Sequence, residues 1–175
     1  MAGKNSTATD REPSVSPDLC AELSAFVLRE SRLLDDGEYD EWASLFAEDG
    51  CYWVPAARGQ RSPSDHVSLF YDDKPTLLAR VARLRHPQIH VQTPPSRTCH
   101  VLSAIAVANA DPASDLYETD ASFVVLEFRP GSDQRVYGGR LRHVLRRKSG
   151  CIEIVMKRVD LVNCDAAFPA LAVPF

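Results

Sequence analysis

The chain has 175 residues, of which 45% are hydrophobic and 25% are charged. This length corresponds to one domain with a sizeable core, and the composition excludes a wholly disordered or collagen-like chain. No apolar run approaches the ~18 residues that a membrane-spanning helix needs, so we expect no membrane association. The 20 basic and 24 acidic residues give a net charge of −4, which argues against a nucleic-acid-binding protein with its usual basic surplus.

The charge is distributed unevenly along the chain. Residues 10–50 hold 12 acidic side chains against three arginines, a net of −9, whereas residues 51–175 hold 16 basic and 12 acidic ones, a net of +4. Two explanations stay open at this point: a solvated acidic helical face, or a surface that meets a basic partner.

The first half of the chain predicts helices. Residues 1–15 are polar and aperiodic, which predicts a disordered N-terminal arm, and residues 16–175 form one predicted domain. Ser16, Pro17 and Asp18 are typical of a helix start, and apolar residues at helical spacing continue this helix to a stop at Gly37.

Shorter elements follow this helix. The apolar spacing predicts a second helix over residues 38–48, and residues 51–55 read as a short strand. A loop at 56–66 leads to a return strand at 67–71. A third helix begins near Asp72 and ends before His86-Pro87, because the residue before proline avoids the helical region.

The second half predicts four long strands, over residues 97–109, 116–129, 134–147 and 151–162. Thirteen residues make a strand of about 40 Å, and strands of such length must twist and curl. The pattern predicts an α+β domain in which helices come first and pack against a curved antiparallel sheet. Gly138-Gly139 inside the third long strand predicts a bulge or a bend there.

Metal, redox and nucleotide motifs are missing from the sequence. The Cys-x-His and Cys-x-x-His pairs of a Rieske cluster do not occur, and Pro87 separates His86 from His90 and breaks the helix that would align them. Cys99 and His100 are adjacent on a strand and point to opposite faces. Five cysteines without a CxxC pair, and a start without an apolar leader segment, predict a reduced cytoplasmic protein.

One acid–base set is conceivable, because a curled sheet that closes over helices can enclose a pocket. The set consists of His100 and His143 in the first and third long strands and of Asp36, Tyr39 and Asp49 near the helix ends, with His100, Asp49 and Tyr39 as the candidate catalytic residues. Each of them also has an ordinary structural explanation, so the default expectation is that the chain has no catalytic residues.

Two other features indicate an interface. Arg140, Arg142 and Arg146 share one face of a strand by parity, and arginine is favoured where proteins meet. The tail at 166–175 is mostly apolar with no charge after Asp165, so it must pack on its own sheet or on a neighbour. The interface candidates are Arg97, Arg140, Arg142, Phe168 and Phe175.

Taken in order, the segments resemble the small (β) subunit of aromatic-ring-hydroxylating dioxygenases. The residues that carry the resemblance are Leu33-Leu34-Asp35, Tyr39, Trp42, Asp49-Gly50-Cys51-Tyr52-Trp53-Val54-Pro55, Tyr71-Asp72-Asp73, Arg80-Val81-x-Arg83-Leu84, Pro94-Pro95-Ser96-Arg97-Thr98-x-His100, Tyr137-Gly138-Gly139-Arg140 and Lys157-Arg158-Val159-Asp160-Leu161. They span about residues 18–165. Their order and spacing together are specific, although no single motif is decisive.

The resemblance implies a cone-like α+β fold of the ketosteroid isomerase and scytalone dehydratase type. It implies a large α subunit that holds a Rieske [2Fe–2S] cluster and a mononuclear Fe(II), with NADH electrons delivered by separate carriers. It also implies an α3β3 hexamer with a β trimer, and no cofactor in this chain. A stand-alone dehydratase or isomerase that uses the cone pocket is the competing hypothesis, and a binding module for a small hydrophobic ligand is a third.

Overall fold

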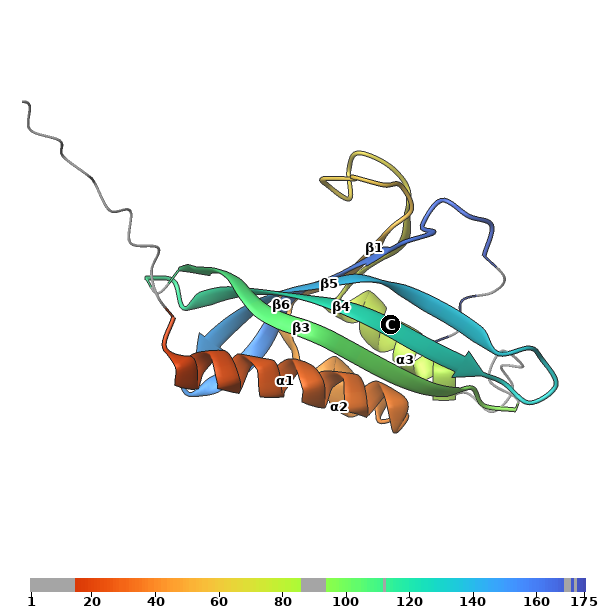
Figure 1. Ribbon diagram of the computed structural model, residues 1–175, viewed down its shortest axis with the longest axis horizontal. Coiled ribbons are helices and arrows are strands. Elements are labelled where there is room, and N and C mark those ends of the chain that lie inside the picture. The colour runs from red at the N-terminus through yellow and green to blue at the C-terminus, as the bar shows by residue number, and fades with distance from the viewer. Residues whose placement is uncertain (1–14, 86–93, 112, 169–170, 172) are drawn as a thin grey trace, which may run out of the picture.

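The computed structural model describes residues 15–85, 94–111, 113–168, 171 and 173–175. Within these residues there are three helices and six strands: α1 (Pro17–Asp35), α2 (Tyr39–Ser44), β1 (Phe46–Pro55), β2 (Ser68–Asp73), α3 (Lys74–Arg85), β3 (Arg97–Asp111), β4 (Leu116–Phe128), β5 (Arg135–Lys148) and β6 (Cys151–Leu161). The strands form one curved sheet in the order β2-β1-β6-β5-β4-β3, and the helices gather on one side of it (Figure 1).

The sheet is antiparallel except for the pairing of β1 with β6. The four long strands lie within two residues of their predicted bounds at each end, and the predicted helix-then-sheet order is confirmed. The predicted N-terminal arm and the His86-Pro87 helix stop lie outside the described residues.

The first helix has the predicted ends. The Ser16 hydroxyl accepts a hydrogen bond from the Leu19 backbone N–H at 3.2 Å, and Gly37 follows the helix with a φ of 74°, a conformation that favours glycine. The predicted helix over 38–48 is wrong in its second half, because α2 ends at Ser44 and Phe46 already belongs to β1.

Long-range contacts end α2 early. The Ile154 backbone N–H donates to the Leu45 carbonyl at 2.8 Å, and Phe46 pairs with Ile154 of β6. The buried Lys74 ammonium donates to the carbonyls of Ala43 and Phe46, at 2.7 and 2.6 Å. These partners satisfy carbonyls at the end of α2, so tertiary pairing overrides the helical spacing.

The glycine pair in β5 is not a bulge. Gly138 and Gly139 pair with Val124 and Phe123 of β4 in unbroken register. A Cβ atom on Gly139 would overlap the carbonyl oxygen of Asp160 on β6, so glycine is required there for close backbone approach rather than for a kink.

The core fills the space between the helices and the inner face of the sheet. The C-terminal tail closes part of it: the Phe175 side chain is 1% exposed, its N–H donates to the Tyr52 hydroxyl at 3.1 Å, and its ring stands edge-on to Tyr137. Phe168 also lies against Tyr137. The tail was expected to pack either on its own sheet or on a neighbour. Phe175 packs on its own chain, and almost none of its side chain is exposed for contact with a neighbour. Within the described segments, no helix combines the length and apolarity needed to span a membrane.

Candidate functional site

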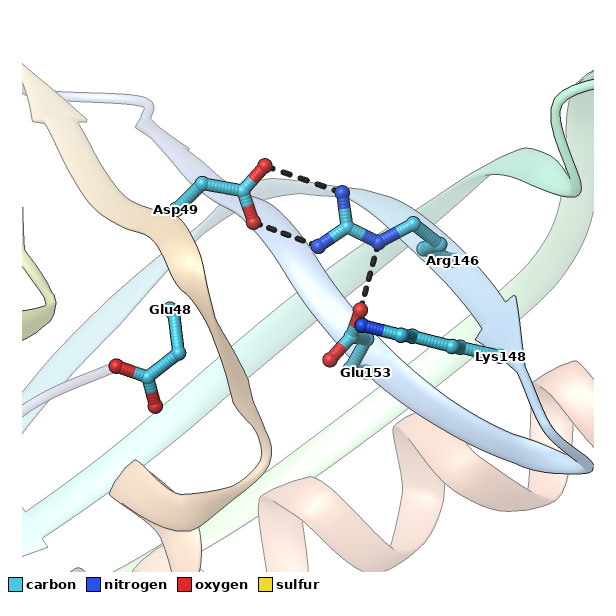
Figure 2. Close-up of a pocket in the computed structure, with 5 residues that line it drawn as sticks. All are labelled: Glu48, Asp49, Arg146, Lys148 and Glu153. Carbon is cyan, nitrogen blue, oxygen red and sulfur yellow. Dashed lines mark hydrogen bonds and ion pairs between the residues drawn. The ribbon is translucent and has the colours of Figure 1, made fainter.

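Asp49 is part of an exposed ion cluster. It lies with Glu48, Arg146, Lys148 and Glu153 around a surface pocket of about 470 Å³ (Figure 2). Arg146 donates two hydrogen bonds to the Asp49 carboxylate, at 2.6 and 3.0 Å, and its Nε donates to Glu153 at 2.6 Å. The Arg146 hydrogen bonds hold the pKa of Asp49 below its usual value. This carboxylate is ionised and already engaged, so it connects β1 to β5 and is poorly suited to proton transfer.

His100 is tied to the end of the first helix. Its Nδ1 lies 2.6 Å from Asp35 Oδ1, and its backbone N–H donates to Asp35 Oδ2 at 2.8 Å. The imidazole is 1% exposed, and burial lowers its pKa despite the nearby carboxylate. Through these two contacts Asp35 ties α1 to β3, which is an edge strand of the sheet, and fixes the orientation of the His100 ring.

The opposite ring nitrogen of His100 has no such contact. Its Nε2 is buried without a hydrogen-bond partner. With Nδ1 protonated toward the Asp35 carboxylate, Nε2 presents a lone pair toward the interior, which is the arrangement of a histidine base oriented by a carboxylate.

Tyr39 lies in the same region as this pair. Burial, followed by the charges of Glu127 and Asp35, raises the pKa of its hydroxyl. The structure therefore brings Tyr39 near the Asp35–His100 pair, whereas Asp49 belongs to the separate exposed cluster on β1.

The sequence analysis singled out His143 but not the buried pair of Glu30 and Lys157 that lies beside it. Glu30 of α1 and Lys157 of β6 are both 0% exposed, and the Lys157 ammonium donates to Glu30 Oε1 at 2.5 Å. The Trp42 indole N–H donates to the same oxygen. His143 of β5 is 1% exposed, with its Nε2 3.8 Å from Glu30 Oε2.

The cluster is charged although it is buried. Burial opposes ionisation, but the charge and the hydrogen bond of Lys157 hold the pKa of Glu30 below its usual value, and burial lowers the pKa of Lys157. Glu30 follows Leu23 and Val27 on the buried stripe of α1, and Lys157 alternates with Val159 on the inner face of β6. A charge on each of two apolar stripes is a sequence signal that each side chain is buried, but it does not identify the partner.

We expect this cluster to make the fold sensitive to acid. Burial lowers the pKa of His143 to about 4, from 6.5 for an exposed histidine. Between pH 6.5 and about 4 the unfolded chain binds a proton at His143 that the native chain does not bind. The stability that neutral His143 contributes is therefore fully present above pH 6.5 and is lost as the pH falls to about 4. The loss amounts to about 3 kcal/mol.

Urea unfolding at pH 7.5 and 4.5 measures this effect. His143→Gln should flatten the dependence on pH, whereas His66→Gln, on an exposed loop, should keep it. An unchanged pH dependence in His143→Gln would contradict the assignment.

The interface candidates on the sheet lie on its outer face, as parity predicts. Arg140 Nε donates to Asp120 at 2.9 Å, and Arg142 comes within 3.9 Å of the same carboxylate. The Arg97 guanidinium lies 5.2 Å from the centre of the Phe128 ring. Within the described ranges, no three His, Cys, Asp or Glu side chains are grouped to hold a metal ion.

Comparison with known proteins agrees with this architecture. The chain is 33% identical over 168 residues to the small oxygenase component of the p-cumate 2,3-dioxygenase system of Pseudomonas putida, covering 90% of this chain and 91% of that one. It is 36% identical over 147 residues to the small subunit of 2-halobenzoate 1,2-dioxygenase of Burkholderia cepacia, covering 81% and 87%. The beta subunit of benzoate 1,2-dioxygenase from Burkholderia mallei superimposes with a TM-score of 0.70 at 27% identity, covering 86% of this chain and 93% of that one.

These likenesses confirm the expected cone-like α+β fold. The sequence model of the ring hydroxylating beta subunit family matches residues 29–166. This range covers the whole sheet, α2, α3 and the end of α1. The chain therefore belongs to the ring hydroxylating beta subunit family.

Proposed function

We propose that this chain is the structural, non-catalytic subunit of its dioxygenase system. It supports a large subunit that holds the Rieske cluster and the mononuclear iron and that dihydroxylates an aromatic ring with O2 and electrons from NADH. In this proposal the chain works in the cytoplasm, self-associates as a trimer within an α3β3 hexamer, and binds no cofactor of its own.

The observation that carries the proposal is the structural use of the candidate catalytic groups. Both oxygens of Asp49 accept hydrogen bonds from Arg146, and Asp35 binds both the ring and the backbone of His100. These contacts join α1 to β3 and β1 to β5. Their loss is expected to weaken the scaffold rather than to remove a chemical step.

One observation favours a second candidate function, a stand-alone isomerase or dehydratase. His100 Nε2 is buried, unpartnered and oriented by a carboxylate, as a general base would be. The two functions make opposite predictions for a conservative change at His100.

We expect His100→Gln to leave the assembled oxygenase active. The glutamine amide can still donate to Asp35, whereas it cannot take up a proton. Loss of a general acid–base group typically costs 10²–10⁴-fold in rate, so the two functions separate clearly. The measurement is ring dihydroxylation by His100→Gln co-purified with the large subunit of the same source, with Asp49→Asn as the matched variant in the exposed cluster.

Activity of either complex within severalfold of wild type supports the structural role. A folded and fully assembled His100→Gln complex with less than about 1% of the activity would contradict it and favour an acid–base role. Thermal unfolding of each variant separates lost chemistry from lost assembly.

A further inference from the structure

Three buried polar atoms beside the pair of Glu30 and Lys157 have no hydrogen-bond partner among the described residues. They are Glu30 Oε2 on α1, Thr119 Oγ1 on β4 and His143 Nε2 on β5. The three residues are at most 1% exposed, so bulk water does not reach these atoms. Nearly all buried polar atoms in folded proteins are hydrogen-bonded to protein or to ordered water, so three such atoms in one place indicate a small binding site.

The strand register brings the three atoms together. Thr119 pairs with His143, which pairs with Lys157 of β6. Their side chains form one row on the inner face of the sheet, with neighbouring Cβ atoms about 5 Å apart. Glu30 reaches this row from α1, because its Oε1 lies 2.5 Å from the Lys157 ammonium and its Oε2 lies 3.8 Å from His143 Nε2. The atoms therefore surround one position between α1 and the sheet.

A fourth unpartnered atom, His100 Nε2, lies in another part of the sheet. His100 pairs with Val125, six residues along β4 from Thr119, which is about 20 Å along the strand. Its ring is held by Asp35. His100 is therefore not part of this position.

The two oxygens of Glu30 are unequally satisfied. Oε1 accepts from the Lys157 ammonium and from the Trp42 indole N–H, whereas Oε2 accepts from none of the described side chains or backbone groups. An ionised carboxylate presents acceptor sites on both oxygens, and burial of a charged oxygen without a donor is costly. Glu30 Oε2 therefore requires a donor.

His143 does not supply this donor directly. Its Nε2 is 3.8 Å from Glu30 Oε2, whereas a direct N–H···O bond spans about 2.7–3.2 Å. Polar groups separated by more than about 3.5 Å are often bridged by water. The Thr119 hydroxyl, on the neighbouring strand, adds a third group that can donate to a bridging molecule.

The surrounding charges and the size of the gap select the occupant. The Lys157 ammonium beside Glu30 repels a metal cation, and the Glu30 carboxylate repels an anion. The occupant must donate to a carboxylate oxygen, accept from a hydroxyl and bond to an imidazole nitrogen in either tautomer. A neutral molecule with two donors and two acceptors meets these demands, and a buried water typically makes about three hydrogen bonds.

We propose that Glu30 Oε2, Thr119 Oγ1 and His143 Nε2 form a binding site for one buried water molecule. The water donates to Glu30 Oε2, accepts from the Thr119 hydroxyl and bonds to His143 Nε2. It supplies the second oxygen of the buried carboxylate with a donor, and it extends the hydrogen-bonded cluster from α1 and β6 to β4. The site thereby helps the fold to hold an ionised Glu30 in its core.

A crystal structure of the full chain, at a resolution that shows ordered water, tests the site directly. We expect one density peak at about 2.7–3.2 Å from each of the three atoms. A direct bond between His143 Nε2 and Glu30 Oε2, another side chain in this position or no peak would overturn the inference. A peak at about 2.0–2.6 Å from the oxygens, the distance of a metal ion, would also overturn it.

A double-mutant cycle tests the site in solution. The Thr119 hydroxyl makes no hydrogen bond with Glu30, so coupling between the two requires a molecule between them. Thr119→Val removes the hydroxyl and keeps the shape, and it should lower the equilibrium constant for folding about fivefold. In a chain that carries Glu30→Met and Lys157→Met, the same change should alter this constant less than about twofold. Urea unfolding at pH 7.5 measures all four chains.

Ser68→Ala is the control for the cycle. The Ser68 hydroxyl accepts from the Trp53 indole N–H at 2.9 Å, and β1 separates its strand from β6. Its loss should cost the same with and without the Glu30 and Lys157 changes.

Two results of the cycle would overturn the inference. One is an equal cost of Thr119→Val in both backgrounds. The other is a rise in stability when Thr119→Val is made in the wild-type chain, because the hydroxyl would then have been buried without a partner. Circular dichroism verifies folding, and if the chain with Glu30→Met and Lys157→Met does not fold, the sign of the Thr119→Val effect and the crystal structure decide.

Discussion

Lys157→Met should destabilise the fold by about 3–5 kcal/mol, because it leaves the Glu30 carboxylate buried without its counter-charge. The pair lies at the centre of the core, with both side chains 0% exposed and the ammonium 2.5 Å from the carboxylate. Methionine matches the shape of the lysine stem, so little of the loss comes from packing. The midpoint of urea unfolding at pH 7.5 measures it.

The double variant Glu30→Gln/Lys157→Met distinguishes charge from shape. The amide oxygen of the introduced glutamine can still accept the Trp42 indole N–H, and removal of both partners is often close to neutral. We expect most of the lost stability to return. Lys148→Met, at the exposed end of β5, is the matched control and should change stability by less than about 0.5 kcal/mol. A broken buried ion pair costs about 3–5 kcal/mol of stability. If Lys157→Met lowers the stability by less than about 1 kcal/mol, the buried Glu30 carboxylate does not depend on the lysine.

Among glycine-to-alanine substitutions in the sheet, Gly139→Ala should cause the largest loss of stability. The new Cβ would overlap the Asp160 carbonyl oxygen, which belongs to the backbone of β6 and cannot rotate away. Strands β5 and β6 must separate locally, and overpacking of this kind costs about 3 kcal/mol or more when backbone must move. Soluble yield and the urea midpoint report the effect.

Gly138→Ala is the matched control, one residue away in the same strand. Its Cβ would stand 3.1 Å from the Phe123 carbonyl oxygen, a tight contact that small shifts relieve. We expect a clearly smaller loss than for Gly139→Ala. Equal stability of the two variants would mean that the β5–β6 approach is looser than the structure has it.

The sequence by itself determined the local elements and their faces. A proline-led helix start, apolar spacing of about four residues and alternating long strands depend on neighbours within a few positions. The helix over α1, the four long strands and the outward row of Arg140, Arg142 and Arg146 were therefore predictable. The ordered resemblance over residues 18–165 added the family, which the match over 29–166 confirms.

Only the tertiary structure decided what the buried polar residues do. Glu30 and Lys157 are 127 positions apart, and Asp35 and His100 are 65 apart. The same reason explains the error at α2, where the parallel pairing of Phe46 with Ile154 ends a helix that local spacing would extend. Phe175 likewise had two possible places until the chain closed over Tyr52. Such pairings depend on how strands and helices cross in space, and no local pattern in the sequence encodes that crossing.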